Sequence, residues 1–164
     1  ERVTESSLVR GYVNATTNAH RRPVPQVAAG RAVHQMGLRV AMLDDSDGVA
    51  RSVFLLAEAN RVDVRLEVAD LPIDAATRAV AELAGVDPLS WALFGGEDYH
   101  LVGAVAPDDF DALTKALADA HTPCHVIGQV LPGVGRVWVR HPDQQLHELA
   151  RIAGFEHFGN PPGT

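Results

Sequence analysis

The sequence predicts an α/β fold of the α+β kind, a mixed β-sheet with helices packed against it. Two patterns predict it. Apolar residues recur at helical spacing in one segment, which carries the stripe Val49, Val53, Leu56 and Ala57. Apolar and charged residues alternate over Val62–Val68, as in a half-buried strand. A chain of 164 residues, 46% of them hydrophobic, can bury one core of this kind.

The N-terminal segment, residues 1–22, is polar and shows no clean periodicity. We expect it to be a polar, weakly ordered leader or the remnant of an interdomain segment, with at most a short helix around Ser7–Val13. Pro23-Val24-Pro25 then marks the start of the main domain, which we place at 23–160.

Periodicity and turn residues predict that helices and strands alternate along this domain and share one sheet. Helices are expected at 26–36, 48–60, 75–84 and 107–120. Strands are expected at 38–43, 62–68, 99–105, 125–131 and 136–141. Asp74 is placed to cap the third helix, and residues 132–135 are typical of a hairpin-like connection. Leu89–Phe94 remains ambiguous.

Composition restricts the partners. The formal charge is −7, from 14 basic and 21 acidic residues, and Lys115 is the only lysine, so no nucleic-acid partner is expected. No apolar run reaches the roughly 18 residues of a membrane span, and the N-terminus resembles no signal peptide. We therefore expect no membrane partner and a cytoplasmic location. Cys124, the only cysteine, excludes an internal disulfide and a cysteine-built zinc site, and is expected to be a buried structural residue.

Three carboxylates gather in the turn Leu43-Asp44-Asp45-Ser46-Asp47-Gly48, between a predicted strand and a predicted helix. In open α/β sheets that edge binds ligands. Magnesium takes carboxylate oxygens and shares them with substrate phosphates, and a helix N-terminus favours phosphate. The plainer explanation is that Ser46 or Asp47 caps the helix. Capping accounts for one of these residues but not for three carboxylates, and at this point both explanations stay open.

Two known acidic loops match part of this turn. A calcium-binding EF-hand loop would begin at Leu43 and end at Phe54, and neither residue supplies a ligand oxygen, so this class is excluded. An aspartyl-nucleophile phosphatase would use Asp45 as the nucleophile and Asp47 as the general acid. That class also needs a downstream lysine and a further acidic pair at a strand end, whereas Lys115 falls inside a predicted helix.

A second loop, Gly95-Gly96-Glu97-Asp98, precedes a predicted strand. Two glycines would let the backbone approach a ligand closely, and Glu97 stands at the entrance of the strand. Taken alone, this loop fits a plain turn better than a binding site.

The ordered set of motifs is more specific than any one of them. The set is His20-Arg21-Arg22-Pro23-Val24-Pro25, Val27–Ala32, Ala41–Gly48, Gly95–Tyr99 and Gly154–Phe158. In this order and spacing the motifs resemble the C-terminal half of the thiamine-monophosphate kinase family, over about residues 20 to 160. That family belongs to the aminoimidazole-ribonucleotide (AIR) synthetase superfamily. The resemblance therefore implies the C-terminal-domain fold of PurM-like proteins.

The resemblance also implies a function. The family transfers the γ-phosphate of ATP, its co-substrate, to thiamine monophosphate in thiamine diphosphate biosynthesis, with magnesium as cofactor. By resemblance, Asp44 and Asp47 would bind Mg²⁺ and Ser46 would contact ATP. Glu97 would contact the thiamine part of the substrate, and Phe158 would lie against its aromatic ring. No residue is assigned as a catalytic acid, base or nucleophile.

Two departures from the family pattern are expected to matter. The N-terminal ATP-binding domain, which by resemblance carries most ATP and magnesium ligands and forms the core of a homodimer, is absent. We therefore expect this chain alone to be inactive as a kinase. Asp45 stands where an apolar residue is usual, and Val49-Ala50-Arg51-Ser52 replaces a more leucine-rich start of the helix. A non-catalytic or divergent binding domain of the same superfamily is thus the alternative, with the phosphatase third.

Overall fold

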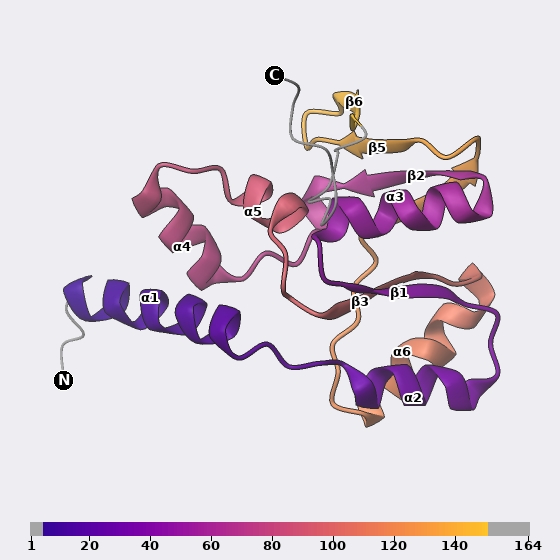
Figure 1. The fold of residues 1–164 in the computed structure, drawn as a ribbon, viewed down its shortest axis with the longest axis horizontal. Helices are drawn as coiled ribbons and strands as arrows, with labels where there is room; N and C mark the ends of the chain where they lie inside the picture. The colour runs from indigo at the N-terminus through magenta and orange to yellow at the C-terminus, as the bar shows by residue number, and fades with distance from the viewer. Residues whose placement is uncertain (1–4, 151–164) are drawn as a thin grey trace, which may run out of the picture.

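The computed structural model describes residues 5–150, which form helices and strands arranged as in Figure 1. The α-helices are α1 (Glu5–Arg21), α2 (Val27–Met36), α3 (Val49–Asn60), α4 (Ala75–Ala84), α5 (Pro88–Phe94) and α6 (Phe110–Asp119). The strands are β1 (Ala41–Asp45), β2 (Val62–Glu67), β3 (His100–Ala104), β4 (Gly128–Pro132), β5 (Val137–Arg140) and β6 (Leu146–Glu148). Short 3-10 turns, η1 (Val68–Asp70) and η2 (Pro107–Asp109), follow β2 and precede α6. Within the described residues, no helix has the length and apolar character that crossing a membrane requires.

The strands form two sheets rather than the single sheet predicted. β1 pairs only with β3, antiparallel, and brings Asp45 opposite His100. The other described strands form a four-stranded sheet in the order β4-β2-β5-β6. The mixed α/β class is confirmed, but the single sheet was wrong. Alternation along a strand indicates which face is buried and carries no information about the neighbouring strand.

β4 and β5 do not form the predicted hairpin, because β2 lies between them. β2 is antiparallel to β4 and parallel to β5. The connection from β4 to β5 crosses the start of β2, where Asp63 receives it. Oδ1 of Asp63 accepts hydrogen bonds from the amides of Val134 (2.8 Å), Gly135 (3.2 Å) and Arg136 (2.9 Å). The Asp63 carboxylate therefore accepts hydrogen bonds from three consecutive backbone amides of the connection between β4 and β5.

The core lies mainly between α3 and the four-stranded sheet (Figure 1). Its α3 members occur at helical spacing, and its sheet members come from β2 and β5: Ala50, Val53, Phe54, Ala57, Leu66, Val137 and Val139. A second cluster joins α2 to α6 through Ala29, Val33, Leu113 and Leu117. In Figure 1 the β1–β3 pair runs between α3 on one side and α2 with α6 on the other. β1 therefore ends at the start of α3, beside the larger core.

Residues 5–21 form the helix α1, where the sequence suggested a weakly ordered leader. The half-buried residues Val9, Tyr12 and Thr16 share one face at helical spacing, and α1 contacts α4. The Thr16 hydroxyl donates to the carbonyl of Tyr12 at 3.1 Å, so a polar residue is accommodated on the half-buried face. A reading based on apolar periodicity overlooks such a stripe. The domain boundary at residue 23 itself stays a prediction.

The predictions based on helix caps and on short segments can also be compared with the structure. The helix expected at 75–84 is confirmed, and Oδ1 of Asp74 accepts from the amide of Ala76 at 2.7 Å, as its cap requires. The ambiguous segment is the helix α5, capped by Asp87, whose Oδ1 accepts from the amide of Leu89 at 2.9 Å. The short strand β6 was not predicted.

Candidate functional site: an acidic turn clamped by a glycine loop

The side-chain directions at the start of the acidic turn follow from the alternation of side chains along β1. Met42 and Asp44 point outward and are exposed, whereas Asp45 is only 1% exposed. Because successive side chains of a strand point to opposite faces, adjacent aspartates of one strand have opposite environments. Ser46 and Asp47 follow in the turn, half-buried and exposed respectively.

Gly48 is the N-cap residue of α3, so neither Ser46 nor Asp47 caps this helix. The φ angle of Gly48 is 96°, and a Cβ there would come within 2.9 Å of the carbonyl oxygen of Leu93. Only glycine fits this conformation and this close approach. The simple capping explanation was therefore wrong, and the side chains of Ser46 and Asp47 remain available for a ligand.

Asp45 is the buried carboxylate of the site. Its Oδ1 accepts a hydrogen bond from the Ser52 hydroxyl at 3.2 Å, and its Oδ2 is buried with no hydrogen-bond partner in the described part of the chain. The pKa of Asp45 is raised to about 6, mainly by burial and in smaller part by the nearby Asp98 carboxylate. The Ser52 hydroxyl, the charge of His100 and the Gly48 amide oppose this rise in the pKa. The cause is desolvation, which disfavours the charged form.

The loop from Gly95 to Tyr99 clamps the acidic turn through its backbone. The amide of Glu97 donates to the carbonyl of Ser46 at 2.8 Å, and the amide of Tyr99 donates to the carbonyl of Asp45 at 2.9 Å. Glu97 and Tyr99 adopt φ angles of 70° and 54°, which are rare for residues with a side chain. These two hydrogen bonds bring Ser46 and Glu97, both predicted site residues, to one place.

The two glycines of this loop allow close contacts between backbone segments. A Cβ at Gly96 would come within 2.7 Å of the Ser46 carbonyl oxygen, and one at Gly95 within 2.5 Å of the Trp91 carbonyl oxygen. From the sequence, a plain turn was favoured, and approach of the backbone to a ligand was the alternative. In the structure the glycines let two segments of backbone approach each other.

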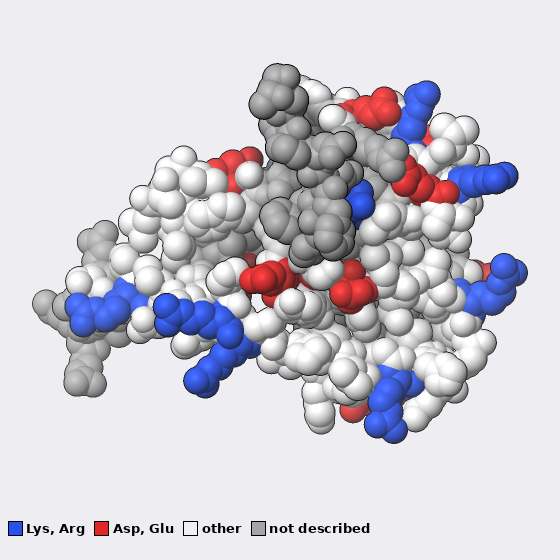
Figure 2. All heavy atoms as spheres, in the orientation of Figure 1, with Lys and Arg blue, Asp and Glu red and all other residues white. Residues whose placement is uncertain are grey.

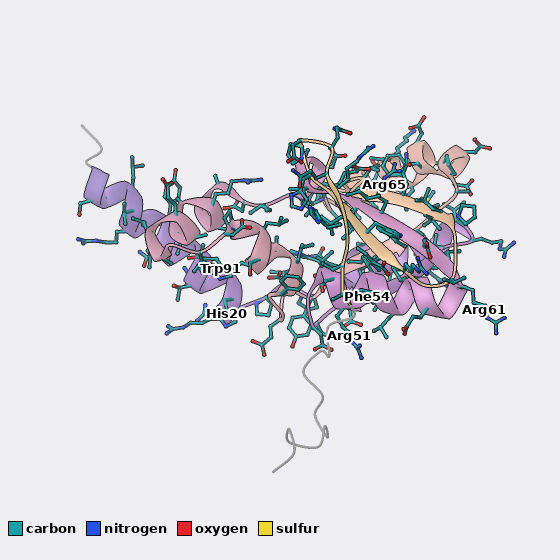
Figure 3. All side chains as sticks on the ribbon, turned by 90° about the horizontal axis from the view of Figure 1, so that it is seen from above. His20, Arg51, Phe54, Arg61, Arg65 and Trp91 are labelled. Atoms are coloured by element: carbon teal, nitrogen blue, oxygen red, sulfur yellow. The ribbon has the colours of Figure 1, made fainter. Side chains whose placement is uncertain are left out.

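Charge of both signs lies near the site. Figure 2 shows acidic side chains near the centre of one face, where Figure 1 places the end of β1 and the loop before β3. At the end of α1, Nε2 of His20 lies 3.9 Å from Oε2 of Glu97, and both side chains are largely exposed. His20 and Arg51, the latter in the first turn of α3, lie on the same side of the molecule in Figure 3.

The donor set fits shared magnesium coordination better than a closed metal cage. Within residues 5–150, no group of three or more His, Cys, Asp or Glu side chains is arranged to hold a metal ion. Asp44 and Asp47 nevertheless present two exposed carboxylates on either side of Ser46. Magnesium in phosphoryl-transfer sites usually binds one or two carboxylates, with waters and substrate phosphates completing its octahedron. Asp45, the third carboxylate of the turn, is buried and does not belong to this exposed donor set.

The structure disfavours both Asp45 and Cys124 as nucleophiles. A phosphatase nucleophile must reach phosphorus along the line of attack, whereas the carboxylate of Asp45 is buried against Ser52. Lys115 lies in α6, in agreement with the predicted helix. Cys124 packs against the α2–α6 cluster, and burial raises the pKa of its thiol, which keeps it protonated.

Sequence reasoning missed part of this site. Ser52 was noted only as a departure from a pattern, and the contact between the glycine loop and the acidic turn was not foreseen. The alternation of β1 was a usable signal, because it predicts that Asp45 points inward wherever Asp44 points outward. Phe158 and the motif around it lie outside the described residues.

Known proteins resemble this chain along most of its length. Residues 12–140 match the family described as AIR synthase related protein, C-terminal domain. The thiamine-monophosphate kinase of Bacillus subtilis (strain 168) is 33% identical over 141 residues, which are 85% of this chain and 41% of that protein. That of Mycobacterium tuberculosis (strain CDC 1551 / Oshkosh) is 34% identical over 143 residues, 87% of this chain and 38% of that protein.

Solved structures agree with this assignment. The structure described as "AaThiL complexed with AMPPCP and TMP" superposes with a TM-score of 0.69 at 25% identity, covering 96% of this chain and 44% of that chain. A HypE–HypF complex, at 16% identity and a TM-score of 0.67, covers 79% of this chain and 42% of that chain and supports the fold alone. This chain thus spans less than half the length of these relatives. From the family match and the shared fold, the chain belongs to the AIR synthase-related family, whose C-terminal domain it forms.

Proposed function

We propose that this chain is the C-terminal half of an ATP- and magnesium-dependent kinase that converts thiamine monophosphate to thiamine diphosphate. The kinases of Bacillus subtilis and Mycobacterium tuberculosis that it resembles carry that name. The observation that carries the proposal is the joining of two loops. The Glu97 amide donates to the Ser46 carbonyl, so the residue assigned to thiamine lies beside the residue assigned to ATP.

Each residue has a stated role in this proposal. Asp44 and Asp47 hold magnesium, which would neutralise charge on the phosphate oxygens. Ser46 contacts ATP, Glu97 contacts the thiamine part of the substrate, and Phe158 lies against its ring. A phosphate oxygen of thiamine monophosphate bonds to the γ-phosphorus of ATP, and the bond from that phosphorus to the β–γ bridging oxygen breaks, releasing ADP. Such a reaction depends on positioning and charge neutralisation more than on a strong base.

The proposal assigns the remaining ligands to an N-terminal half, which also forms a homodimer, in the cytoplasm where ATP is available. This division explains why the described residues carry two exposed carboxylates at the turn and no complete metal cage. It also explains how a chain of formal charge −7 could bind a phosphate, since metal ions would supply the positive charge.

Calorimetry of the full-length polypeptide that contains this chain, with Mg²⁺ and the ATP analogue AMPPCP, tests the metal role. Asp44→Asn and Asp47→Asn should each weaken Mg²⁺-dependent binding by roughly tenfold or more, since each removes a carboxylate ligand. Asp119→Asn, an exposed residue at the end of α6, makes the same change in net charge away from the site. If all three variants bind as tightly as the unsubstituted chain, the assignment of the turn to magnesium is wrong.

The substrate is tested separately on the full-length polypeptide that contains this chain. Conversion of ATP and thiamine monophosphate to ADP and thiamine diphosphate, followed by chromatography, should depend on Asp44 and Asp47. A stable protein that binds neither compound would instead identify a non-catalytic domain of the same superfamily.

A further inference from the structure

The two oxygens of the Asp45 carboxylate have different surroundings. Oδ1 accepts a hydrogen bond from the Ser52 hydroxyl at 3.2 Å. Oδ2 is buried and has no hydrogen-bond partner among the described residues. Buried polar atoms in folded proteins are nearly always paired, so an unpaired carboxylate oxygen calls for a physical explanation. The whole residue is 1% exposed, so solvent does not supply the missing donor.

An apolar side chain would be the more stable choice at this position. Asp45 ends the strand that leads into α3, whose core residues Ala50 and Val53 are 1% and 3% exposed. A carboxylate there keeps a desolvated charge with one of its oxygens unsatisfied. Sequences that break a packing rule in this way commonly do so at functional sites.

Asp45 also lies where three elements meet. Oγ of Ser52, in α3, lies 3.3 Å from the Asp44 carbonyl oxygen and 3.2 Å from Oδ1 of Asp45. The Asp45 carbonyl accepts from the amide of Tyr99, in the loop before β3. The residue therefore connects the end of β1 to α3 by its side chain and to the glycine loop by its backbone. Its neighbours on the chain, Asp44 and Ser46, are the residues whose directions these contacts set.

We infer that Asp45 is a positioning residue of the acidic turn: its Oδ1 fixes the turn against Ser52, its carbonyl fixes it to the glycine loop, and its carboxylate adds a buried negative charge next to Asp44, which with Asp47 would bind the magnesium ion. This inference rests on the proposed function, because it requires magnesium at that turn. It adds a carboxylate that does not bind the ion directly. Groups that orient metal ligands or their waters typically change metal affinity by 10–100-fold when they are removed.

The test measures Mg²⁺ affinity on the full-length polypeptide that contains this chain and thermal stability on the 164-residue chain. Affinity is measured by calorimetry with AMPPCP present, and stability by melting in EDTA. Asp45→Leu should raise the melting temperature, because it removes a buried charge, and should weaken Mg²⁺ binding by roughly tenfold or more. Asp45→Asn, which keeps the shape, should weaken binding in the same direction. Ser52→Ala should also weaken binding, although it leaves every carboxylate in place.

A purely structural Asp45 gives a different result. Asp45→Leu and Asp45→Asn would then change the melting temperature and leave Mg²⁺ affinity unchanged, which overturns the inference. If Asp45→Leu fails to fold, Asp45→Asn and Ser52→Ala still decide it. Asp44→Asn separates a failure of the positioning role from a failure of the magnesium site itself. Lost affinity in Asp44→Asn with normal affinity in both Asp45 variants refutes only the positioning role. Unchanged affinity in Asp44→Asn, or no Mg²⁺ binding by the unsubstituted full-length polypeptide, refutes the magnesium site and this inference together.

Discussion

Replacing Asp45 by asparagine should stabilise the metal-free chain at neutral pH and have little effect in acid. Burial raises the pKa of Asp45 from its ordinary 3.8 to about 6. At pH 7.5 the folded protein therefore carries a desolvated carboxylate that is better solvated after unfolding. A pKa difference of this size corresponds to at most about 3 kcal/mol of lost stability. Asparagine has the shape of the protonated acid without the charge, so the substitution should recover most of that free energy.

The sign of the pH dependence follows from proton binding. Between pH 3.8 and about 6 the folded state binds the Asp45 proton more tightly than the unfolded state does. The contribution of this residue to the free energy of unfolding therefore falls as the pH rises through that window, and its full cost is present above it. Below pH 3.8 both states are protonated, and the unsubstituted chain and Asp45→Asn should be nearly equally stable.

Thermal melting in EDTA from pH 4 to 8 measures the effect. For a chain of this size, about 3 kcal/mol corresponds to roughly 6–12 °C in melting temperature at pH 7.5. Asp119→Asn, at an exposed position, should shift the curve far less at every pH. Parallel pH profiles for the unsubstituted chain and Asp45→Asn would refute the argument, because they would show that Asp45 has the same proton affinity in both states.

Three further substitutions test other parts of the structure, each by thermal or denaturant unfolding. Asp63→Asn should lower the melting temperature at pH 7, and the loss should shrink below pH 3.8, because hydrogen bonds from backbone amides, that of Arg136 first, lower the pKa of Asp63. Gly96→Ala should cost roughly 1–3 kcal/mol, since its Cβ would press on a carbonyl oxygen at 2.7 Å. Its control, Gly11→Ala, has open space and should instead gain roughly 0.5–1 kcal/mol in a helix. Asp74→Ala should cost about 1 kcal/mol by removing the cap of α4.

Helices with local signals could be predicted from the sequence. The segment 75–84 carries its own start and stop, because Asp74 accepts a hydrogen bond from the first turn and Gly85 takes the left-handed conformation at the end. The helix α1 has no comparable apolar stripe, since the polar Thr16 lies on its half-buried face, and the helix contacts α4. A helix of that kind is decided by tertiary contact.

Strand partners could not be predicted. The alternation of β2 indicates its buried face, yet nothing in that pattern shows that β4 and β5 lie on either side of it. The turn between β4 and β5 is typical of a hairpin, but Asp63 receives its amides across the start of β2. Pairing depends on contacts between residues far apart in the chain, and periodicity describes only near neighbours.

The sequence by itself determined the ordered motifs that show the family, the acidic turn between strand and helix, and, through the two-residue period of β1, the opposite directions of Asp44 and Asp45. Only the tertiary structure decided that Asp45 meets Ser52, that one of its oxygens is left without a donor, and that the glycine loop clamps the turn through Ser46. The physical reason is the distance along the chain over which each feature is determined. Side-chain direction follows from the local backbone, whereas burial and hydrogen-bond partners are set by segments that folding brings together.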